Sequence, residues 1–336
     1  MGKNIDYLPE PFYHILRPFP IKPLKIEQYK LVFRVTAAEG IFALKEIKYP
    51  ENEFRFIYAA MEHLVSHGFT RINKMILTKN YYPFSEFKGR KFGLSKWIQG
   101  READYSQKWD LNIAARTLAD LHKSSKDFNP PPFEGRIKWG TWPVSMKGKM
   151  EELLDFKKSV QRKSRKSFFD QVFLAHVDYY VGECETALEY LARGAYEKVN
   201  SHDAQKQYFC HHDYAHHNVI IDEKGKGNVI DFDYCISDIR CHDIGSLMLR
   251  VLKKGEWNYK KAMYALKSYD HKRRVSSKET EVIKALLRFP QDFWQVAFAY
   301  YVERNQPRER LERKIKNWVQ DKERRRKSLC KLDKLI

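Results

Sequence analysis

The stretch CHHDYAHHNVIID, residues 210–222, decides how the rest of the chain is interpreted. It holds four histidines, and His212 and His216 have the four-residue spacing of zinc ligands on a helix. However, the segment runs straight into NVIID (218–222), a β-branched run that predicts a strand. A zinc site would also need a further, well-spaced ligand. We therefore interpret the histidines as secondary and look to the residues between them for the chemistry.

Asp213 and Asn218 lie five residues apart, and a predicted hairpin follows them. The runs NVIID (218–222) and NVIDFD (228–233) flank the glycine-containing turn EKGKG, which puts Asp231 at the end of the second strand. In protein-kinase-like phosphotransferases, one aspartate orients the acceptor hydroxyl, while an asparagine and a second aspartate hold Mg²⁺ against the nucleotide phosphates. Hard oxygen ligands suit Mg²⁺. The pattern predicts Asp213 as the catalytic residue and Asn218 and Asp231 as metal ligands. The alternative for Asp213 and Asn218 is a turn held by side-chain hydrogen bonds to the backbone.

The first hundred residues predict a small sheet with one helix. The runs QYKLVFRVTA (28–37) and GIFALKEIKY (40–49) are rich in strand-forming residues, and the AEG between them is a hairpin signal. Residues 50–69 repeat apolar side chains at three- and four-residue spacing, which predicts an amphipathic helix. RINKMILTKN (71–80) and RKFGLSKWIQG (90–100) predict two further strands.

Lys45 stands in the middle of an apolar strand, directly after the first hairpin. A lysine there is costly unless it is paired or faces a site, and kinases hold the nucleotide phosphates with a strand lysine. We therefore predict that Lys45 binds the nucleotide. The helix that follows should offer it a carboxylate, for which Glu53 is better placed than Glu62. The alternative is a lysine on the solvent face of the strand.

The junction LSKWIQG (94–100) predicts an adenine-binding hinge formed by the backbone of Trp97, Ile98 and Gln99. Ordinary core packing is the alternative role for Trp97. The loop that would cover the phosphates falls within KIEQYK (25–30), which contains no glycine. This weakens the expectation that backbone N–H groups cradle the phosphates.

From residue 102 the pattern becomes helical. Apolar faces predict helices over 111–125, 168–192 and 289–305, and the charged stretch 303–328 predicts a solvated helix. The chain is therefore predicted to have an α+β, bilobal, protein-kinase-like fold, with the lobe boundary near Gly100. A small N-terminal antiparallel sheet with one helix (1–99) would bind the nucleotide. A larger, mainly helical lobe (100–336) would carry the catalytic and acceptor-binding residues and a basic C-terminal helix.

SDIRCHDIGSLML (237–249) places Asp238 and Asp243 before a predicted helix. Asp243 would either brace the catalytic loop or serve as a carboxylate that the helix dipole favours. Both interpretations stay open.

The net charge of +19 is compatible with anionic partners but does not specify one. No nucleic-acid-reading motif is present, and aromatic residues do not alternate with the basic runs, so we predict no specific nucleic acid. The longest apolar runs are too short to span a bilayer, and the first sixteen residues lack the charged start and apolar core of a signal peptide. Five cysteines without a C-x-x-C pair predict reduced thiols in a cytosolic setting.

Several stretches together resemble the CotS-like spore coat proteins of endospore-forming bacteria, which are similar to aminoglycoside phosphotransferases and choline kinases. These stretches are CHHDYAHHNVIID, NVIDFDYCISDIRCHDIGSL, LVFRVTAAEGIFALKEI, MEHLVSHGF, LADLHKSSKDF and LRFPQDFW. The resemblance runs from about residue 20 to 325. It implies ATP and Mg²⁺ as cofactors, an unknown acceptor substrate, other spore coat proteins as partners, and synthesis in the cytoplasm followed by location in the spore coat.

The resemblance also assigns roles to single residues. Asp213 matches the catalytic aspartate, Asn218 and Asp231 the metal ligands, and Lys45 the phosphate-binding lysine. Asp243 matches an aspartate that supports the loop, and His212 stands where relatives usually carry glycine.

Two hypotheses follow. The chain is a kinase for a hydroxyl of a small molecule or coat component, or it is a catalytically weak or inactive structural coat protein whose twenty tyrosines could support cross-linking.

Overall fold

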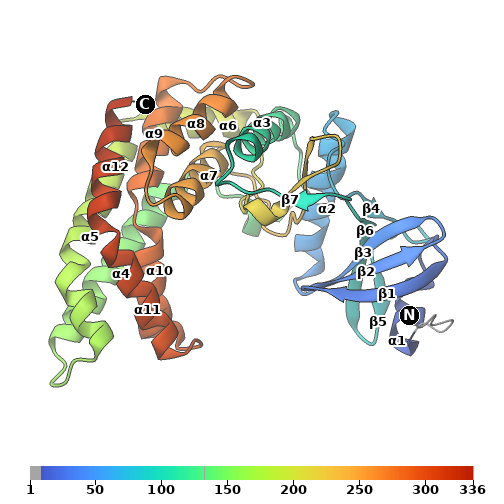
Figure 1. Cartoon of the computed structure of the whole chain (residues 1–336), viewed down its shortest axis with the longest axis horizontal. Coiled ribbons are helices and arrows are strands. Elements are labelled where there is room, and N and C mark those ends of the chain that lie inside the picture. The colour runs from blue at the N-terminus through green and yellow to red at the C-terminus, as the bar shows by residue number, and fades with distance from the viewer. Residues whose placement is uncertain (1–8, 132, 336) are drawn as a thin grey trace.

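The structure is a computed structural model that describes residues 9–131 and 133–335. A small lobe built around a sheet adjoins a larger, mainly helical lobe, which confirms the predicted α+β, kinase-like fold (Figure 1). Residues 1–8, on which the signal-peptide expectation partly depends, lie outside the described residues. Among the described helices, none is long and apolar enough to cross a membrane.

The small lobe contains a six-stranded antiparallel sheet in the order β1-β2-β3-β6-β4, with β5 also paired to β6. Helix α1 covers one face, because Ile15, Leu16 and Phe19 form a buried cluster with Val35 and Leu44 of the sheet. The bounds are α1 Glu10–Leu16, β1 Pro23–Tyr29, β2 Val32–Ala37, β3 Gly40–Ile47, α2 Glu51–Ser66, β4 Met75–Ile76, β5 Ser85–Phe87 and β6 Arg90–Lys96.

Several details of this lobe differ from the prediction. The phosphate loop was expected within residues 25–30 and a single strand over 28–37. Instead, Pro23–Tyr29 forms strand β1, which pairs with β2 through a two-residue turn at Lys30 and Leu31. The sequence signal was weak because β1 is an edge strand with an exposed polar side, and Lys-Leu is not a typical turn dipeptide. In the run 71–80, only Met75–Ile76 forms a strand. Helix α1 was not predicted.

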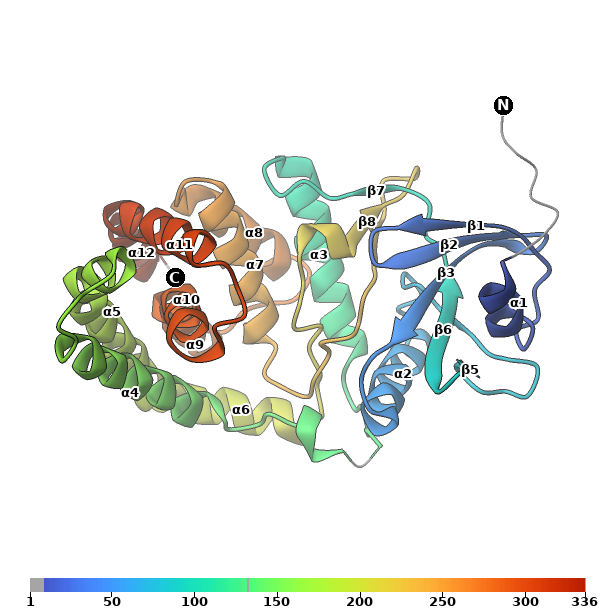
Figure 2. The same ribbon diagram turned by 90° about the horizontal axis from the view of Figure 1, so that it is seen from below.

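The large lobe begins where the chain enters a second, three-stranded sheet of order β7-β8-β9 (Figure 2). Gly100 precedes β7 with φ of +149°, and a Cβ there would lie 2.4 Å from the carbonyl oxygen of Ile221. Only glycine fits so close a backbone approach. The lobe boundary near Gly100 remains a proposal, because Phe56, Ile57 and Ala60 of α2 belong to the same buried cluster as the helices of the large lobe.

The elements of the large lobe are mostly helices around one hydrophobic core. They are β7 Arg101–Glu102, α3 Lys108–Ser124, η1 Glu134–Arg136, α4 Trp142–Gln161, α5 Phe168–Ala192, α6 Ala195–Gln205, η2 His216–Asn218, β8 Val219–Ile221, β9 Gly227–Val229, α7 Cys241–Lys254, α8 Tyr259–Asp270, α9 Ser277–Arg288, α10 Gln291–Phe298, the π-helical turn η3 Ala299–Glu303, α11 Arg308–Gln320 and α12 Lys322–Leu335.

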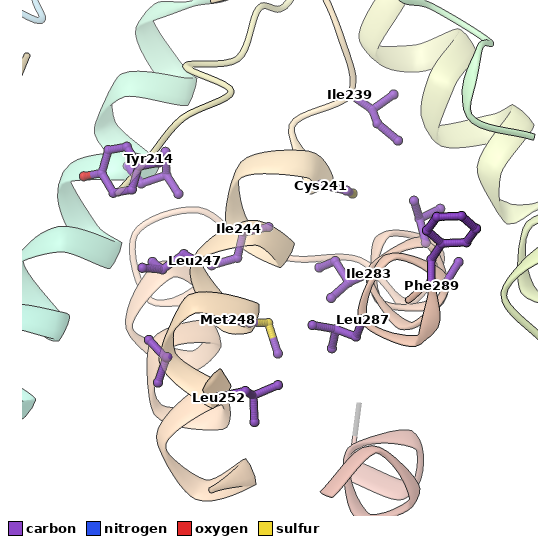
Figure 3. Packing of buried hydrophobic residues seen from close by; sticks show 14 of the residues in the cluster. Tyr214, Ile239, Cys241, Ile244, Leu247, Met248, Leu252, Ile283, Leu287 and Phe289 are labelled. Atoms are coloured by element: carbon purple, nitrogen blue, oxygen red, sulfur yellow. The ribbon is translucent and has the colours of Figure 1, made fainter. Parts of the chain in front are cut away.

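Helix α7 is anchored in this core by apolar side chains. Figure 3 shows Met248 on α7 directed towards Leu287 on α9, whereas Leu247 lies on the opposite side of α7, and all three are at most 1% exposed. Burying side chains of this size stabilises the packing by ~1.5–3 kcal/mol each. The polar side of α7 is thereby held towards the loop that carries Asp213.

The C-terminal stretch is not the solvated helix that its charge predicted. It forms two helices, and α12 buries Arg325, Leu329 and Leu332 to 1% exposure each. Arg325 donates to Glu183 on α5 over 2.7 Å. A narrow apolar stripe and one paired arginine suffice to dock a mostly charged helix, which a composition argument does not detect.

Candidate active site

The loop 210–218 is held by a buried carboxylate beneath it. Asp243, in the first turn of α7, accepts hydrogen bonds from the backbone N–H of His211 at 2.7 Å and of His212 at 2.9 Å. His122 of α3 lies 3.2 Å from the same carboxylate, which is fully buried. Although burial opposes ionisation, hydrogen bonds from His122 and His242 hold the pKa of Asp243 well below its usual value. An ionised Asp243 carboxylate is therefore consistent with the loop-bracing role suggested by the sequence.

The predicted catalytic residue, Asp213, has a different partner on each of its two carboxylate oxygens. Asn218 donates from Nδ2 to Oδ2 at 3.1 Å and to the Asp213 carbonyl at 2.9 Å. Arg250 of α7 donates from Nη2 to Oδ1 at 2.6 Å. Sequence reasoning missed Arg250, although it stands seven residues after Asp243 and therefore on the same helix face.

The predicted metal ligand Asp231 lies just beyond β9, with φ of +65°. A left-handed conformation is unfavourable for an aspartate and is typical of functional loops. Lys45 Nζ lies 2.8 Å from Asp231 Oδ1 and 2.8 Å from Asp233 Oδ2. Burial disfavours the ammonium, but the two carboxylates outweigh it and raise the pKa of Lys45. Asp233, which was not among the predicted ligands, thus lies in the same cluster.

The donor set around Asp231 suits a hard divalent cation. The Asn218 side-chain NH₂ is directed to Asp213, which leaves its amide oxygen as the group able to coordinate a metal. Together with the Asp231 and Asp233 carboxylates, it forms an all-oxygen set of the kind that Mg²⁺ prefers. A metal bound there would compete with Lys45 for the same carboxylates.

Glu53 does not pair with Lys45. It accepts from Arg136 Nη2 at 2.9 Å instead, while Arg136 Nη1 donates to the carbonyls of Asp233 at 2.7 Å and Cys235 at 2.9 Å. The expected Lys45–Glu53 pair fails because Lys45 is neutralised by two nearer carboxylates, and Glu62 is exposed on α2. Arg136 therefore links α2 to the segment that carries Asp231, and no local pattern could have revealed it.

The predicted hinge follows β6. The Trp97 amide donates to the Ile41 carbonyl at 3.0 Å, so an adenine contact would fall to the backbone of Ile98 and Gln99. The Trp97 ring is half-buried and packs edge-on against Tyr29, with ring centroids 5.2 Å apart. Trp97 therefore supports the end of β1 beside the hinge.

The β1–β2 turn takes the place of a glycine-rich loop. Lys30 has φ of +53° and forms an ion pair with Glu102 of β7, while Leu31 is 92% exposed. A two-residue turn offers few free N–H groups to a phosphate. The nearby Lys30 ammonium is already neutralised by Glu102.

His212 occupies a left-handed backbone position, with φ of +66°. Glycine adopts this conformation easily, which agrees with the expectation from the sequence resemblance that relatives carry glycine here. The His212 ring stacks on His242, with centroids 3.6 Å apart. Burial and the neighbouring His242 hold the pKa of His212 well below its usual value. A neutral, stacked ring thus packs the loop against His242 of α7.

The zinc interpretation of the four histidines finds no geometric support in the described part of the chain. One group there has metal-ligand proximity, formed by His122, Cys210 and Asp243 within 4.8 Å of one another. None of the four histidines of 210–222 belongs to it. All three are buried, His122 and Asp243 are hydrogen-bonded to each other, and Cys210 Sγ donates to the Asp238 and Ile239 carbonyls. This group of side chains helps to hold the loop 210–218 in place.

Comparison with solved structures identifies the same architecture in phosphotransferases. An aminoglycoside phosphotransferase from Alicyclobacillus acidocaldarius superposes with a TM-score of 0.85 at 19% identity, covering 98% of this chain and 97% of that one. Choline kinase LicA from Streptococcus pneumoniae gives 0.51 at 16% identity, covering 92% and 94%. At such identities these structures establish the fold alone.

Comparison with curated and family sequences identifies the biological class. Spore coat protein S of Bacillus subtilis is 22% identical over 291 residues, which are 85% of this chain and 82% of that protein. The family model described as "Spore coat putative kinase YutH" matches residues 14–332. The resemblance predicted from the sequence is thereby confirmed. Because this match spans nearly the whole chain, the protein belongs to that kinase-like family of spore coat proteins.

Proposed function

We propose that this protein is an ATP- and Mg²⁺-dependent phosphotransferase of the spore coat, which transfers the γ-phosphoryl group to a hydroxyl of a small molecule or coat component. The observation that carries the proposal is the meeting of four polar groups from both lobes. Asn218 donates to Asp213 at 3.1 Å, and Lys45 of the small lobe reaches Asp231 at 2.8 Å.

Nucleotide use is supported by the ligands in structures of the same fold. A spectinomycin phosphotransferase was solved with AMP, and also with ADP and spectinomycin. An amicoumacin kinase was solved with AMP-PNP and Ca²⁺. We extend nucleotide binding to this chain because Lys45 and Asp231 supply the matching cation and carboxylate.

Each residue has a defined task in this proposal. Asn218 and Asp231 would hold Mg²⁺, which supplies charge neutralisation for the phosphates when bound. Lys45 would bind the phosphate oxygens in place of its present carboxylate partners. Asp213 would accept the proton of the acceptor hydroxyl as the new O–P bond forms and ADP leaves. Ile98 and Gln99 would contact the adenine.

Location and partners are part of the same proposal. Membership of a spore coat family supports a place in the coat and contact with other coat proteins. An acceptor within that layer would then be available to the enzyme.

A structural role in the coat is the second candidate. It is favoured by the ion pairs within the site. Asp231 and Asp233 neutralise Lys45. Asp213, in turn, is paired with Arg250. The short β1–β2 turn also favours the structural role, because it offers few N–H groups to a phosphate. On this view, the kinase-like cleft would be a retained scaffold.

Calorimetric titration with ATP and MgCl₂ separates the two candidates. The wild type should bind, Asp231→Ala should lose metal-dependent binding, and Asp213→Asn should bind normally but lose phosphoryl transfer. Asp155→Ala is a matched control, because Asp155 is 70% exposed on α4 and pairs with Lys158 on its own helix. Absence of binding in the wild type would reject the phosphotransferase and leave the structural role.

A further inference from the structure

The strongest unexplained contact near the candidate site is that between Arg250 and Asp213. The guanidinium Nη2 donates to Asp213 Oδ1 at 2.6 Å, and the two side chains are 37% and 28% exposed. A catalytic carboxylate needs an open oxygen for the acceptor hydroxyl. The position of Arg250 therefore bears on which acceptors can reach Asp213.

The two oxygens of Asp213 face different sides of the site. Oδ2 accepts from Asn218, whose own amide oxygen is a predicted metal ligand, so Oδ2 lies on the nucleotide side. Oδ1 accepts from Arg250, which comes from α7 of the large lobe. An acceptor hydroxyl that approaches Oδ1 therefore meets the guanidinium at hydrogen-bonding distance.

The last turn of α7 adds two further cations. Lys253 forms an ion pair with Asp292 of α10, and Lys254 pairs with Asp104, between β7 and α3, at 2.9 Å. With Arg250, three successive cations on α7 thus each reach a carboxylate of a different segment. These three carboxylates are already matched by the chain's own cations and offer no surplus negative charge.

An acceptor that approaches Oδ1 must take the place of this carboxylate oxygen on the Arg250 guanidinium. An anionic group can replace Asp213 as the partner of the guanidinium, whereas a cationic group would be repelled by it.

We propose that Arg250 is a specificity-determining residue that selects an acceptor alcohol bearing a carboxylate or phosphate group. This inference rests on the proposed phosphotransferase function. Arginine binds such groups through two parallel N–H donors, whereas a lysine acts as a point charge. When the acceptor anion takes the guanidinium, Asp213 Oδ1 is freed to accept the hydroxyl proton. The acceptor oxygen then bonds to the γ-phosphorus, the bond from phosphorus to the β-phosphate oxygen breaks, and the proton leaves to solvent from Asp213.

The test uses alcohols that differ mainly in charge. D-glucuronate, D-glucose and D-glucosamine form one series, and D-glycerate, glycerol and 2-amino-1,3-propanediol form another. Transfer from ATP, followed as phosphorylated product, should occur with the anionic member of a series and be at least about tenfold weaker with the other two, which is ~1.4 kcal/mol of discrimination. Preference for a neutral or cationic member, or transfer to none of the six while MgATP binds, would overturn the inference.

Variants at Arg250 separate specificity from structure. Arg250→Gln should raise KM for the anionic acceptor at least about tenfold while KM for ATP stays unchanged, and Arg250→Lys should recover part of the loss. Arg250→Glu should move the preference towards D-glucosamine. Arg274→Gln is the matched control, because Arg274 is 90% exposed and pairs with Asp270 at the end of α8.

The failure modes are distinguishable. A fall in kcat with an unchanged acceptor KM in Arg250→Gln would show that the arginine acts on the transferred phosphoryl group, and would reject the inference. Loss of MgATP binding in the wild type would reject the proposed function itself. Thermal unfolding of each variant checks that the fold is kept.

Discussion

Lys45 on β3 and Asp231 beyond β9 form an ion pair of 2.8 Å that joins the two lobes. Asp233 holds the same ammonium at 2.8 Å. The residue predicted to bind phosphate thus neutralises the residue predicted to bind the metal. Binding of MgATP would exchange this internal pair for contacts to the ligand, so the pair sets the resting state of the cleft.

Replacing Lys45 with methionine tests this exchange. The variant should lose at least about tenfold in MgATP affinity, or ~1.4 kcal/mol, because the phosphates lose their cation. It should also unfold at a lower temperature, since Asp231 and Asp233 are left as adjacent, partly buried carboxylates. Calorimetric titration and thermal unfolding measure the two effects. Added MgCl₂ should restore part of the lost stability by neutralising both carboxylates, and no response to MgCl₂ would argue against a metal site there.

Arg136 should stabilise the segment that carries Asp231 and Asp233 without itself contacting a bound ligand. Arg136→Met removes the donors to Glu53 and to the Asp233 and Cys235 carbonyls, and should lower the free energy of unfolding by about 1–3 kcal/mol. Metal-dependent ATP affinity should fall as well, because the backbone around Asp231 loses its support. Urea unfolding and calorimetry provide the readouts. Glu53→Gln, which keeps a hydrogen-bond acceptor, should have the milder effect, and the reverse order would contradict the proposed link.

Asp238 predicts a pH dependence of stability. Burial raises its pKa to about 6, although His242 and the indole N–H of Trp142 oppose the shift. The unfolded pKa is about 3.9, so between about pH 4 and 6 the folded state binds more protons and stability falls as pH rises. The shift of ~2 pKa units corresponds to about 3 kcal/mol.

The comparison of wild type with Asp238→Asn isolates this contribution. Urea unfolding at pH 4.5 and 7.5 should show the wild type losing stability relative to the variant at the higher pH. Parallel pH profiles for the two proteins would mean that Asp238 stays ionised throughout.

Arg325 tests the docking of the C-terminal helix. Its side chain is 1% exposed and donates to Glu183 at 2.7 Å. Arg325→Leu should destabilise the protein by about 3–5 kcal/mol, because Glu183 keeps its burial but loses one of its two arginine partners, Arg288 being the other. Chemical denaturation measures the loss. Arg326→Leu is the control, since Arg326 is 50% exposed and pairs with Glu323 on its own helix. Equal effects of both changes would show that α12 is solvated after all.

Local patterns predicted the parts of the site that lie close together in the chain. Asp213, Asn218 and the hairpin that leads to Asp231 are separated by short, regular elements, so spacing alone brings them together. The predicted helix over 50–69 was confirmed as α2 for the same reason, because its apolar face repeats with the helical period.

Other features depended on contacts between distant segments. Strand β1 escaped prediction because an edge strand with an exposed polar side lacks a clear apolar alternation. Glu53 was assigned to Lys45 by analogy of position, whereas Arg136, 83 residues away, competes for it. Such competition between charges is decided by distance in the folded protein and leaves no mark on the periodicity of the sequence.

The amino-acid sequence by itself determined the fold class and the loop–hairpin unit with its carboxylates and amide, because these follow from periodicity and short-range spacing. It indicated the family through its resemblance to known spore coat proteins. The tertiary structure alone decided which charges meet: Lys45 with Asp231 and Asp233, Glu53 with Arg136, and Asp213 with Arg250. The physical reason is that Coulomb energy and desolvation depend on how far apart and how deeply buried the charged groups are in space. The same helices and strands, arranged differently, would bring other charges together.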